Sequence, residues 1–260
     1  ILWTLLALDK FFPLPLPLPA NQYSILILAK DGERPLRGFT NAAGNWCYPM
    51  TLAEVSPFYL EALLTYEDRW FWWHPGVNPV ALLRATGQLL KYGRIISGGS
   101  TLTMQVARLL DPHQRSVAGK LKQIFRALQL EWHLSKSEIL TLYLNLAPFG
   151  GPLEGVQAAS FAYLGKSAKT LSRAEAALLA ILPQSPTRLR PDLHPRRAEQ
   201  ARNKVLDRLT KFRRWTAETV ADAKIEPVTS RLYSQPMVAP LLSQRLKGQI
   251  EPGKPLITTI

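Results

Sequence analysis

The sequence predicts a mainly α-helical fold with a small N-terminal β element. Capping residues followed by proline, or by glutamate three positions later, mark helix starts at several points. Apolar residues then recur at three- and four-residue intervals, as on one face of a helix. No region alternates strands with helices, which argues against a doubly wound Rossmann-like sheet. At 260 residues the chain can bury a sizeable core.

The β element is expected first, because the apolar run at 24–29 leads into Asp31-Gly32, a hairpin turn signal. Ser56-Pro57 then predicts a helix start, since serine caps a helix and proline fits its first turn. The expected helices cover residues 56–68, 78–93, 101–110, 120–132, 154–164, 196–209 and 216–224, with two more headed by the capping boxes Ser135-x-x-Glu138 and Ser172-x-x-Glu175. In the fourth of these, the apolar residues fall on one face of the helix: Leu121, Ile124, Phe125, Leu128 and Trp132.

The chain is strongly basic, with a formal net charge of +13. Such a balance indicates an acidic partner: nucleic acid, an anionic membrane surface or a phosphorylated substrate. The basic run at 188–214 contains no groove-reading motif, so a nucleic-acid partner is the least favoured. Cys47 is the only cysteine, which excludes an internal disulfide, and the four histidines lack metal-ligand spacing, so we expect no zinc site.

Composition divides the chain into four expected parts. Residues 1–7 are almost wholly apolar, and prolines alternate with leucines up to Pro19. We interpret residues 1–20 as the remnant of a membrane anchor with a stiff proline-rich linker, although a frayed tail or a core strand is the alternative. A small β linker region is expected at 21–50, the main helical domain at 51–225, and an extended linker at 226–260.

Glu67 is the first candidate for chemistry. It ends its predicted helix, where the helix dipole disfavours a negative charge, and such a position favours a general base. The alternative is a solvated carboxylate paired with Arg69. The aromatic run at 70–73 is compatible with core packing, sugar stacking or a membrane-surface belt, but four consecutive rings cannot all face inward.

A second candidate is the glycine turn at 98–101, which precedes the helix expected at 101–110. Free backbone N–H groups and hydroxyls at a helix N-terminus bind anions, although an ordinary helix cap is the alternative. Thr101, Gln105 and Arg108 share one face of this helix. A group of cations follows, which is either a solvated surface or a cluster that binds a pyrophosphate: Arg115, Lys120, Lys122 and Arg126.

Four ordered segments resemble the signature blocks of the family 51 peptidoglycan glycosyltransferases. They are Glu67-Asp68-Arg69-x-Phe71-x-x-His74-x-Gly76, then Gly98-Gly99-Ser100-Thr101-Leu102-Thr103-x-Gln105, then Lys136-x-Glu138-Ile139-Leu140-x-x-Tyr143-Leu144-Asn145, and last Ala158-Ala159 through Tyr163-x-Gly165-Lys166 to Glu175-Ala176-Ala177 and Leu182-Pro183. The amino-acid sequences of two segments, 102–108 and 147–151, are similar to those of the 1C branch of the bifunctional class A penicillin-binding proteins.

The resemblance implies a lysozyme-like, mainly α domain on the periplasmic side of the cell inner membrane. It would polymerise lipid II into glycan strands with inversion and release undecaprenyl pyrophosphate. The implied partners are lipid II, the growing glycan strand and the cytoplasmic membrane, with moenomycin as inhibitor and no nucleic acid. The implied cofactor is Mg²⁺ or another divalent cation, with no organic cofactor. A transpeptidase domain would follow residue 260.

The resemblance also assigns site residues. Glu67 matches the catalytic base, and Gln123 stands where the family commonly has a second glutamate. The residues expected to bind substrate or to surround the base are Asp68, Phe71, His74, Ser100, Thr101, Gln105, Arg108, Arg115, Lys120, Lys122 and Asn145. No metal ligand is assigned.

Gln123 is the main departure from the family pattern. An amide cannot ionise, so it cannot act as an acid or as an anionic metal ligand. On the resemblance alone, Gln123→Glu is expected to raise the rate or the metal response. Glu131 is a substitute carboxylate only if it shares the face of Gln123. Two other readings stay open: a lysozyme-like enzyme that cleaves glycan, and a non-catalytic module that binds lipid II or glycan.

Overall fold

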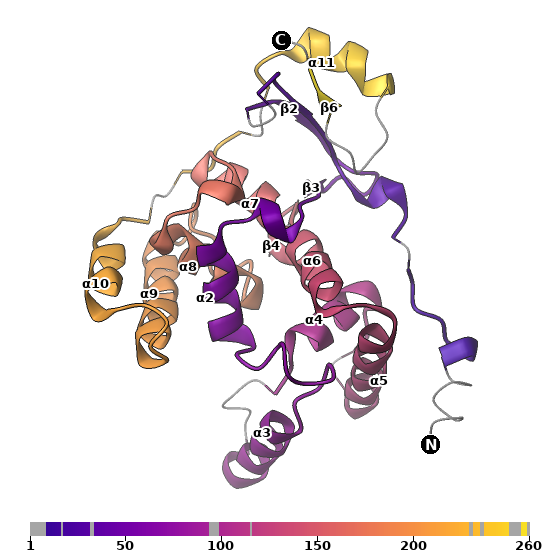
Figure 1. Ribbon diagram of the computed structural model, residues 1–260, viewed down its shortest axis with the longest axis vertical. Coiled ribbons are helices and arrows are strands. Elements are labelled where there is room, and N and C mark those ends of the chain that lie inside the picture. The colour runs from indigo at the N-terminus through magenta and orange to yellow at the C-terminus, as the bar shows by residue number, and fades with distance from the viewer. Residues whose placement is uncertain are drawn as a thin grey trace. The chain divides into compact units, whose positions relative to one another are not determined.

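The computed structural model describes residues 9–16, 18–31, 34–93, 99–114, 116–228, 231–234, 237–249 and 256–258 (Figure 1). The expected anchor at 1–7, Gly32, Gly98 and Arg115 lie outside these residues. Helices predominate, which confirms the mainly α class. Among the described residues, no helix is both long and apolar enough to cross a bilayer. The chain divides into a first unit, residues 1–18 and 67–143, and a second unit, residues 19–66 and 144–260.

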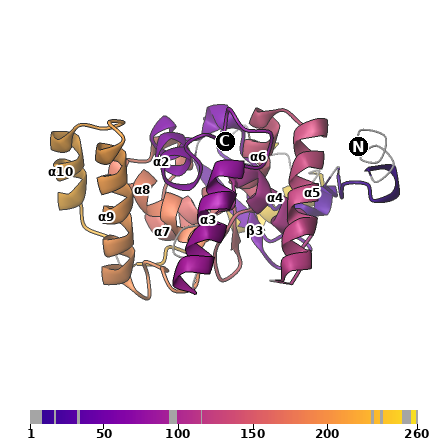
Figure 2. The same ribbon diagram turned by 90° about the horizontal axis from the view of Figure 1, so that it is seen from below.

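The first unit is built on helices whose starts follow the predicted capping rules. Its helices are α3 (Pro79–Tyr92), α4 (Leu102–Leu110), α5 (Val117–His133) and most of α6 (Lys136–Leu146). The Asn78 side chain accepts from the Ala81 N–H at the start of α3, and the Thr101 and Ser116 hydroxyls cap α4 and α5 in the same way. Helices α4 and α5 lie side by side (Figures 1 and 2).

The apolar face of α5 is not the face that is buried. Leu121, Leu128 and Trp132 are exposed, whereas the buried residues of the helix are Gly119, Gln123, Ala127, Gln129 and Leu130. Apolar spacing identified a face of the helix, but hydrogen bonds decide which face packs. Gln123 donates to the Met104 carbonyl of α4, and this contact turns the small and amide residues inward.

Asp111, which closes α4, also ties it to α5. Lys122 and Arg126 donate to its two carboxylate oxygens at 2.7 and 2.8 Å. Burial alone would raise the pKa of Asp111, but the two cations outweigh that effect and lower it. Lys122 is therefore held by a carboxylate of the protein.

The second unit packs its helices around α7 (Val156–Leu164), eight of whose nine residues are buried. Four further helices are α2 (Pro57–Glu67, whose last residue begins the first unit), α8 (Arg173–Ile181), α9 (Pro195–Lys211) and α10 (Ala217–Ile225). The last three lie side by side (Figure 2). Both predicted capping boxes form: Glu138 accepts from the Ser135 N–H in the first unit, and Glu175 from the Ser172 N–H here.

Two small sheets complete the second unit. In one, β1 (Ile25–Leu28) pairs antiparallel with β2 (Pro35–Phe39) and parallel with β6 (Leu256–Ile257). The first two strands confirm the expected β element. The other sheet was not predicted, because its strands are too short to show a period of two: β3 (Trp46–Cys47), β5 (Leu153–Glu154) and β4 (Pro148–Gly150). Short 3₁₀ helices occupy Ala20–Gln22, Leu52–Glu54, Ala168–Thr170, Leu182–Gln184 and Lys247–Gln249.

The segment 226–260, expected to be extended, instead contains α11 (Pro240–Leu246) as well as β6. Pro240 takes the first helical position, where its missing N–H costs nothing. Leu246 packs against a buried cluster that includes Ile27 and Phe39. Apolar burial therefore folds this segment back onto the first sheet.

Arg202 of α9 is expected to be essential for the stability of the second unit. Its side chain is 1% exposed and donates to two backbone carbonyls at the C-terminal end of α10, those of Lys224 in the last turn and of Glu226 just after it. Arg202→Ala leaves both carbonyls without their donor and should lower the free energy of unfolding by about 2–4 kcal/mol. Chemical denaturation would measure this loss. Arg196→Ala, an exposed position on the same helix, should change it by less than about 0.5 kcal/mol; equal losses would contradict the role of Arg202.

Candidate active site

The carboxylate of Glu67, the last residue of α2, accepts a hydrogen bond from Gln105 of α4. The Gln105 Nε2 lies 2.8 Å from Glu67 Oε2. The guanidinium of Arg69, the alternative partner considered for Glu67, lies 5.3 Å from the centre of the Trp70 ring. The amide of Gln105 donates this hydrogen bond and so orients the carboxylate, which is the group that a general base needs.

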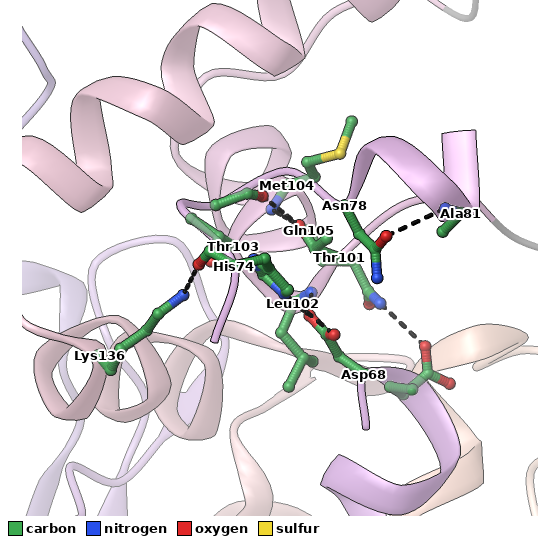
Figure 3. A network of polar contacts seen from close by, with 12 residues as sticks. Asp68, His74, Asn78, Ala81, Thr101, Leu102, Thr103, Met104, Gln105 and Lys136 are labelled. Carbon is green, nitrogen blue, oxygen red and sulfur yellow. Dashed lines mark hydrogen bonds and ion pairs between the residues drawn. The ribbon is translucent and has the colours of Figure 1, made fainter. Parts of the chain in front are cut away.

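Asp68, the next residue, holds the start of α4. Its carboxylate accepts from the Leu102 N–H at 2.9 Å and from His74 Nε2 at 2.9 Å (Figure 3). A carboxylate at a helix N-terminus satisfies a backbone N–H that has no partner within the helix and complements the helix dipole. Because Gln105 lies one turn further along α4, this contact also determines where Gln105 meets Glu67.

Gly76 closes the loop that follows Glu67. Its φ of +81° is left-handed, and a Cβ at this position would lie 2.8 Å from the Ala127 carbonyl oxygen of α5. The Thr101 hydroxyl donates to the Gly76 carbonyl and also accepts from the Met104 N–H. The glycine of the first signature block is therefore required by close packing between the loop and α5.

A partly buried ion pair that sequence reasoning missed supports the same loop. Lys136 Nζ lies 2.7 Å from Glu131 Oε1, 2.6 Å from the His74 carbonyl oxygen and 4.7 Å from the Phe71 ring centre. Thr103 donates to Glu131 at 2.6 Å. The third signature block contains Lys136, but no local pattern shows that it reaches back to residue 74.

Glu131 is therefore not a substitute for the missing glutamate at position 123. Eight residues separate the two positions, which places them about 12 Å apart along α5. The Glu131 carboxylate is already held by Thr103 and Lys136.

Lys120 is the cation that the structure brings to the glycine turn. Its Nζ lies 2.6 Å from Ser100 Oγ and 3.0 Å from Gln123 Oε1. Burial lowers the pKa of Lys120, and the nearby charge of Arg108 lowers it further. Ser100, Arg108 and Lys120, three of the predicted anion-binding residues, are thus gathered at the junction of α4 and α5; we call them the anion cluster.

Several other predicted substrate-binding residues make contacts within the protein. The side chains of Asp68, Phe71, His74 and Thr101 are less than 9% exposed and contact other protein groups. Asn145 belongs to the second unit, where its buried amide bonds the backbone of Met50 in both directions. Lys122 is held by Asp111, and Arg115 lies outside the described residues.

The aromatic run divides as expected for consecutive rings. Phe71 is fully buried, whereas Trp70, Trp72 and Trp73 are 53%, 49% and 82% exposed. One ring serves the core, and the other three are presented to the surroundings.

Comparison with known proteins identifies the class. A family model described as Transglycosylase matches residues 34–210, and the chain belongs to this family. It is 57% identical to penicillin-binding protein 1C of Escherichia coli over 96% of its length, which is 32% of that protein. It is 38% identical to penicillin-binding protein 1A of Pseudomonas aeruginosa over 78% of its length, or 25% of that protein. The chain thus spans about a third or less of these relatives.

Among solved structures, penicillin-binding protein 1A of Haemophilus influenzae matches with a TM-score of 0.47 and 22% identity, over 88% of this chain and 24% of that one. The family assignment, together with the helices described above, confirms the predicted fold class and the resemblance.

Removal of the Gln105 amide should impair the site without unfolding it. A hydrogen bond to a charged group contributes about 1.5–3 kcal/mol, so Gln105→Leu should lower the rate of a reaction that uses Glu67 as its base by roughly 10- to 100-fold. Steady-state kinetics would measure this, with a thermal melt to verify folding. Gln114→Leu, an exposed position in the same unit, is the matched control. Unchanged turnover in Gln105→Leu would show that Glu67 needs no orientation by α4.

Proposed function

We propose that this chain is a peptidoglycan glycosyltransferase that polymerises lipid II and releases undecaprenyl pyrophosphate. The observation that carries the proposal is the oriented Glu67 carboxylate, whose partner Gln105 lies on the same helix as Arg108 of the anion cluster. A base and a site for an anionic leaving group are the two parts that this transfer requires. Membership of the transglycosylase family supports the same activity.

In the proposed reaction, Glu67 removes the proton from the 4-hydroxyl of the acceptor N-acetylglucosamine. That oxygen attacks C1 of the N-acetylmuramic acid at the reducing end of the growing strand and inverts it. The bond from C1 to the pyrophosphate oxygen breaks, and the electron pair leaves with undecaprenyl pyrophosphate. Lys120, Arg108 and Ser100 offer the donors that stabilise the negative charge on that group.

The wider assignments follow from the same proposal. The domain would comprise residues 51–225 and work at the periplasmic side of the inner membrane, with the growing glycan strand as substrate and moenomycin as inhibitor. The three exposed tryptophans and the net charge of +13 suit an anionic membrane surface.

Glycan cleavage is less well supported. A glycosidase needs two carboxyl groups on either side of the bond that is cleaved. Asp68 is the carboxylate next to Glu67 in sequence, and it is buried against Leu102 and His74. The anion cluster, moreover, has no role in hydrolysis of a glycan.

Replacement of the proposed base gives the sharpest test. Glu67→Gln keeps the size and a hydrogen-bonding side chain but cannot accept a proton, so polymerisation in detergent should disappear while lipid II binding persists. Moenomycin should inhibit the polymer that the unaltered chain makes. Glu218→Gln, an exposed position in the first turn of α10, should leave the rate unchanged.

Two outcomes would count against the proposal. Near-normal polymerisation by Glu67→Gln would remove Glu67 as the base. Binding of lipid II by the unaltered chain without any polymer would instead favour the non-catalytic module.

A further inference from the structure

The resemblance implies a divalent cation near position 123, and the residues found there do not fit one. Gln123 is 6% exposed, and both ends of its amide are occupied: Oε1 accepts from Lys120 Nζ at 3.0 Å, and Nε2 donates to the Met104 carbonyl at 2.6 Å. A hard cation such as Mg²⁺ prefers carboxylate oxygens and water. Among the described residues, no group of three or more histidine, cysteine or acidic side chains could hold a metal ion.

The position beside the Gln123 oxygen is already taken by a cation of the protein. Lys120 bridges Gln123 of its own helix and Ser100 of the glycine turn, so its ammonium is fixed in place. Both of these partners are neutral. In the described part of the chain, no carboxylate pairs with Lys120, in contrast to Lys122 two residues later, which Asp111 neutralises.

We infer that Gln123 is a positioning residue that holds the uncompensated Lys120 ammonium at the anion cluster, so that the leaving diphosphate is stabilised by protein cations without a divalent cation. This inference deepens the proposed function and rests on it. The ligand class is a prenyl diphosphate, the product side of the proposed transfer.

Hydrogen-bond direction explains why an amide suits position 123 better than a carboxylate. The Met104 carbonyl can only accept, so the side chain opposite it must donate, which an ionised carboxylate cannot do. A glutamate in the same conformation would set two acceptors against each other in a buried site. It would also neutralise Lys120. The structure therefore reverses the expectation from the resemblance, and Gln123→Glu should weaken the site.

The electrostatics of Lys120 point the same way. Burial and the charge of Arg108 both disfavour its ammonium form, as the lowered pKa shows. A diphosphate that enters the anion cluster supplies negative charge that favours the ammonium form. Two cations at this junction thus supply the positive charge that a bound metal ion would otherwise provide.

The test is isothermal titration of the chain with farnesyl diphosphate, in EDTA and in Mg²⁺. Binding by the unaltered chain should persist in EDTA and differ by less than about twofold between the two buffers, a gap of about 0.4 kcal/mol. Lys120→Met and Gln123→Glu should each weaken binding by about tenfold or more in EDTA. Gln244→Glu, which adds the same charge at an exposed position of α11 in the second unit, should stay within about twofold of the unaltered chain.

Three results would overturn the inference. The first is that the unaltered chain binds more tightly in Mg²⁺ than in EDTA, by about tenfold or more. The second is that Lys120→Met binds as tightly as the unaltered chain. The third is that, in Mg²⁺, Gln123→Glu binds more tightly than the unaltered chain. Lys120→Met keeps the test valid should the buried Gln123→Glu variant fail to fold. Lipid II polymerisation, measured in parallel, separates the two claims. If the unaltered chain polymerises lipid II but does not bind farnesyl diphosphate in EDTA, the inference is refuted while the proposed function stands.

Discussion

The hydrogen bond from the Leu102 N–H to the Asp68 carboxylate is the contact on which the candidate site depends. It joins the residue after Glu67 to the first residue of α4, and these two points lie 34 positions apart in the chain. Through it, the loop that follows the proposed base and the helix that carries Gln105 are held in one register. A carboxylate at this place is stable because a helix N-terminus offers it both N–H groups and a favourable dipole.

The pairing of α4 with α5 shows how polar groups can determine which face of a helix packs. Gln123 reaches the Met104 carbonyl, and Arg126 reaches Asp111. The first contact gives the buried Gln123 Nε2 its acceptor, and the second adds a donor to the Asp111 carboxylate beside Lys122. The apolar residues of α5, such as Leu121, are left on the outer side. In this unit the alignment of two helices follows from directional bonds, and apolar burial adds to it.

Much of the fold could be predicted from the sequence, because helix starts are local. Serine, threonine and asparagine caps lie within three residues of the groups that they bond, so Ser172 and Asn78 could be identified without any tertiary information. The short strands and the packed face of α5 could not, since both depend on distant partners. At the candidate site, the position of Glu67 in its helix suggested a base, whereas the contact of Lys136 with the His74 carbonyl was missed because it reaches 62 residues back.

The parallel pairing of β6 with β1 has a consequence for the order in which the chain can fold. Ile27 lies opposite Leu256, and the Thr258 N–H donates to the Leu28 carbonyl. While the chain emerges from the ribosome, β1 can pair with β2 at once, but its other edge stays open until more than two hundred further residues have been made. An open edge that contains Ile27 is able to recruit a strand from another molecule. The second unit therefore keeps an open strand edge that can associate with another molecule until β6 is added.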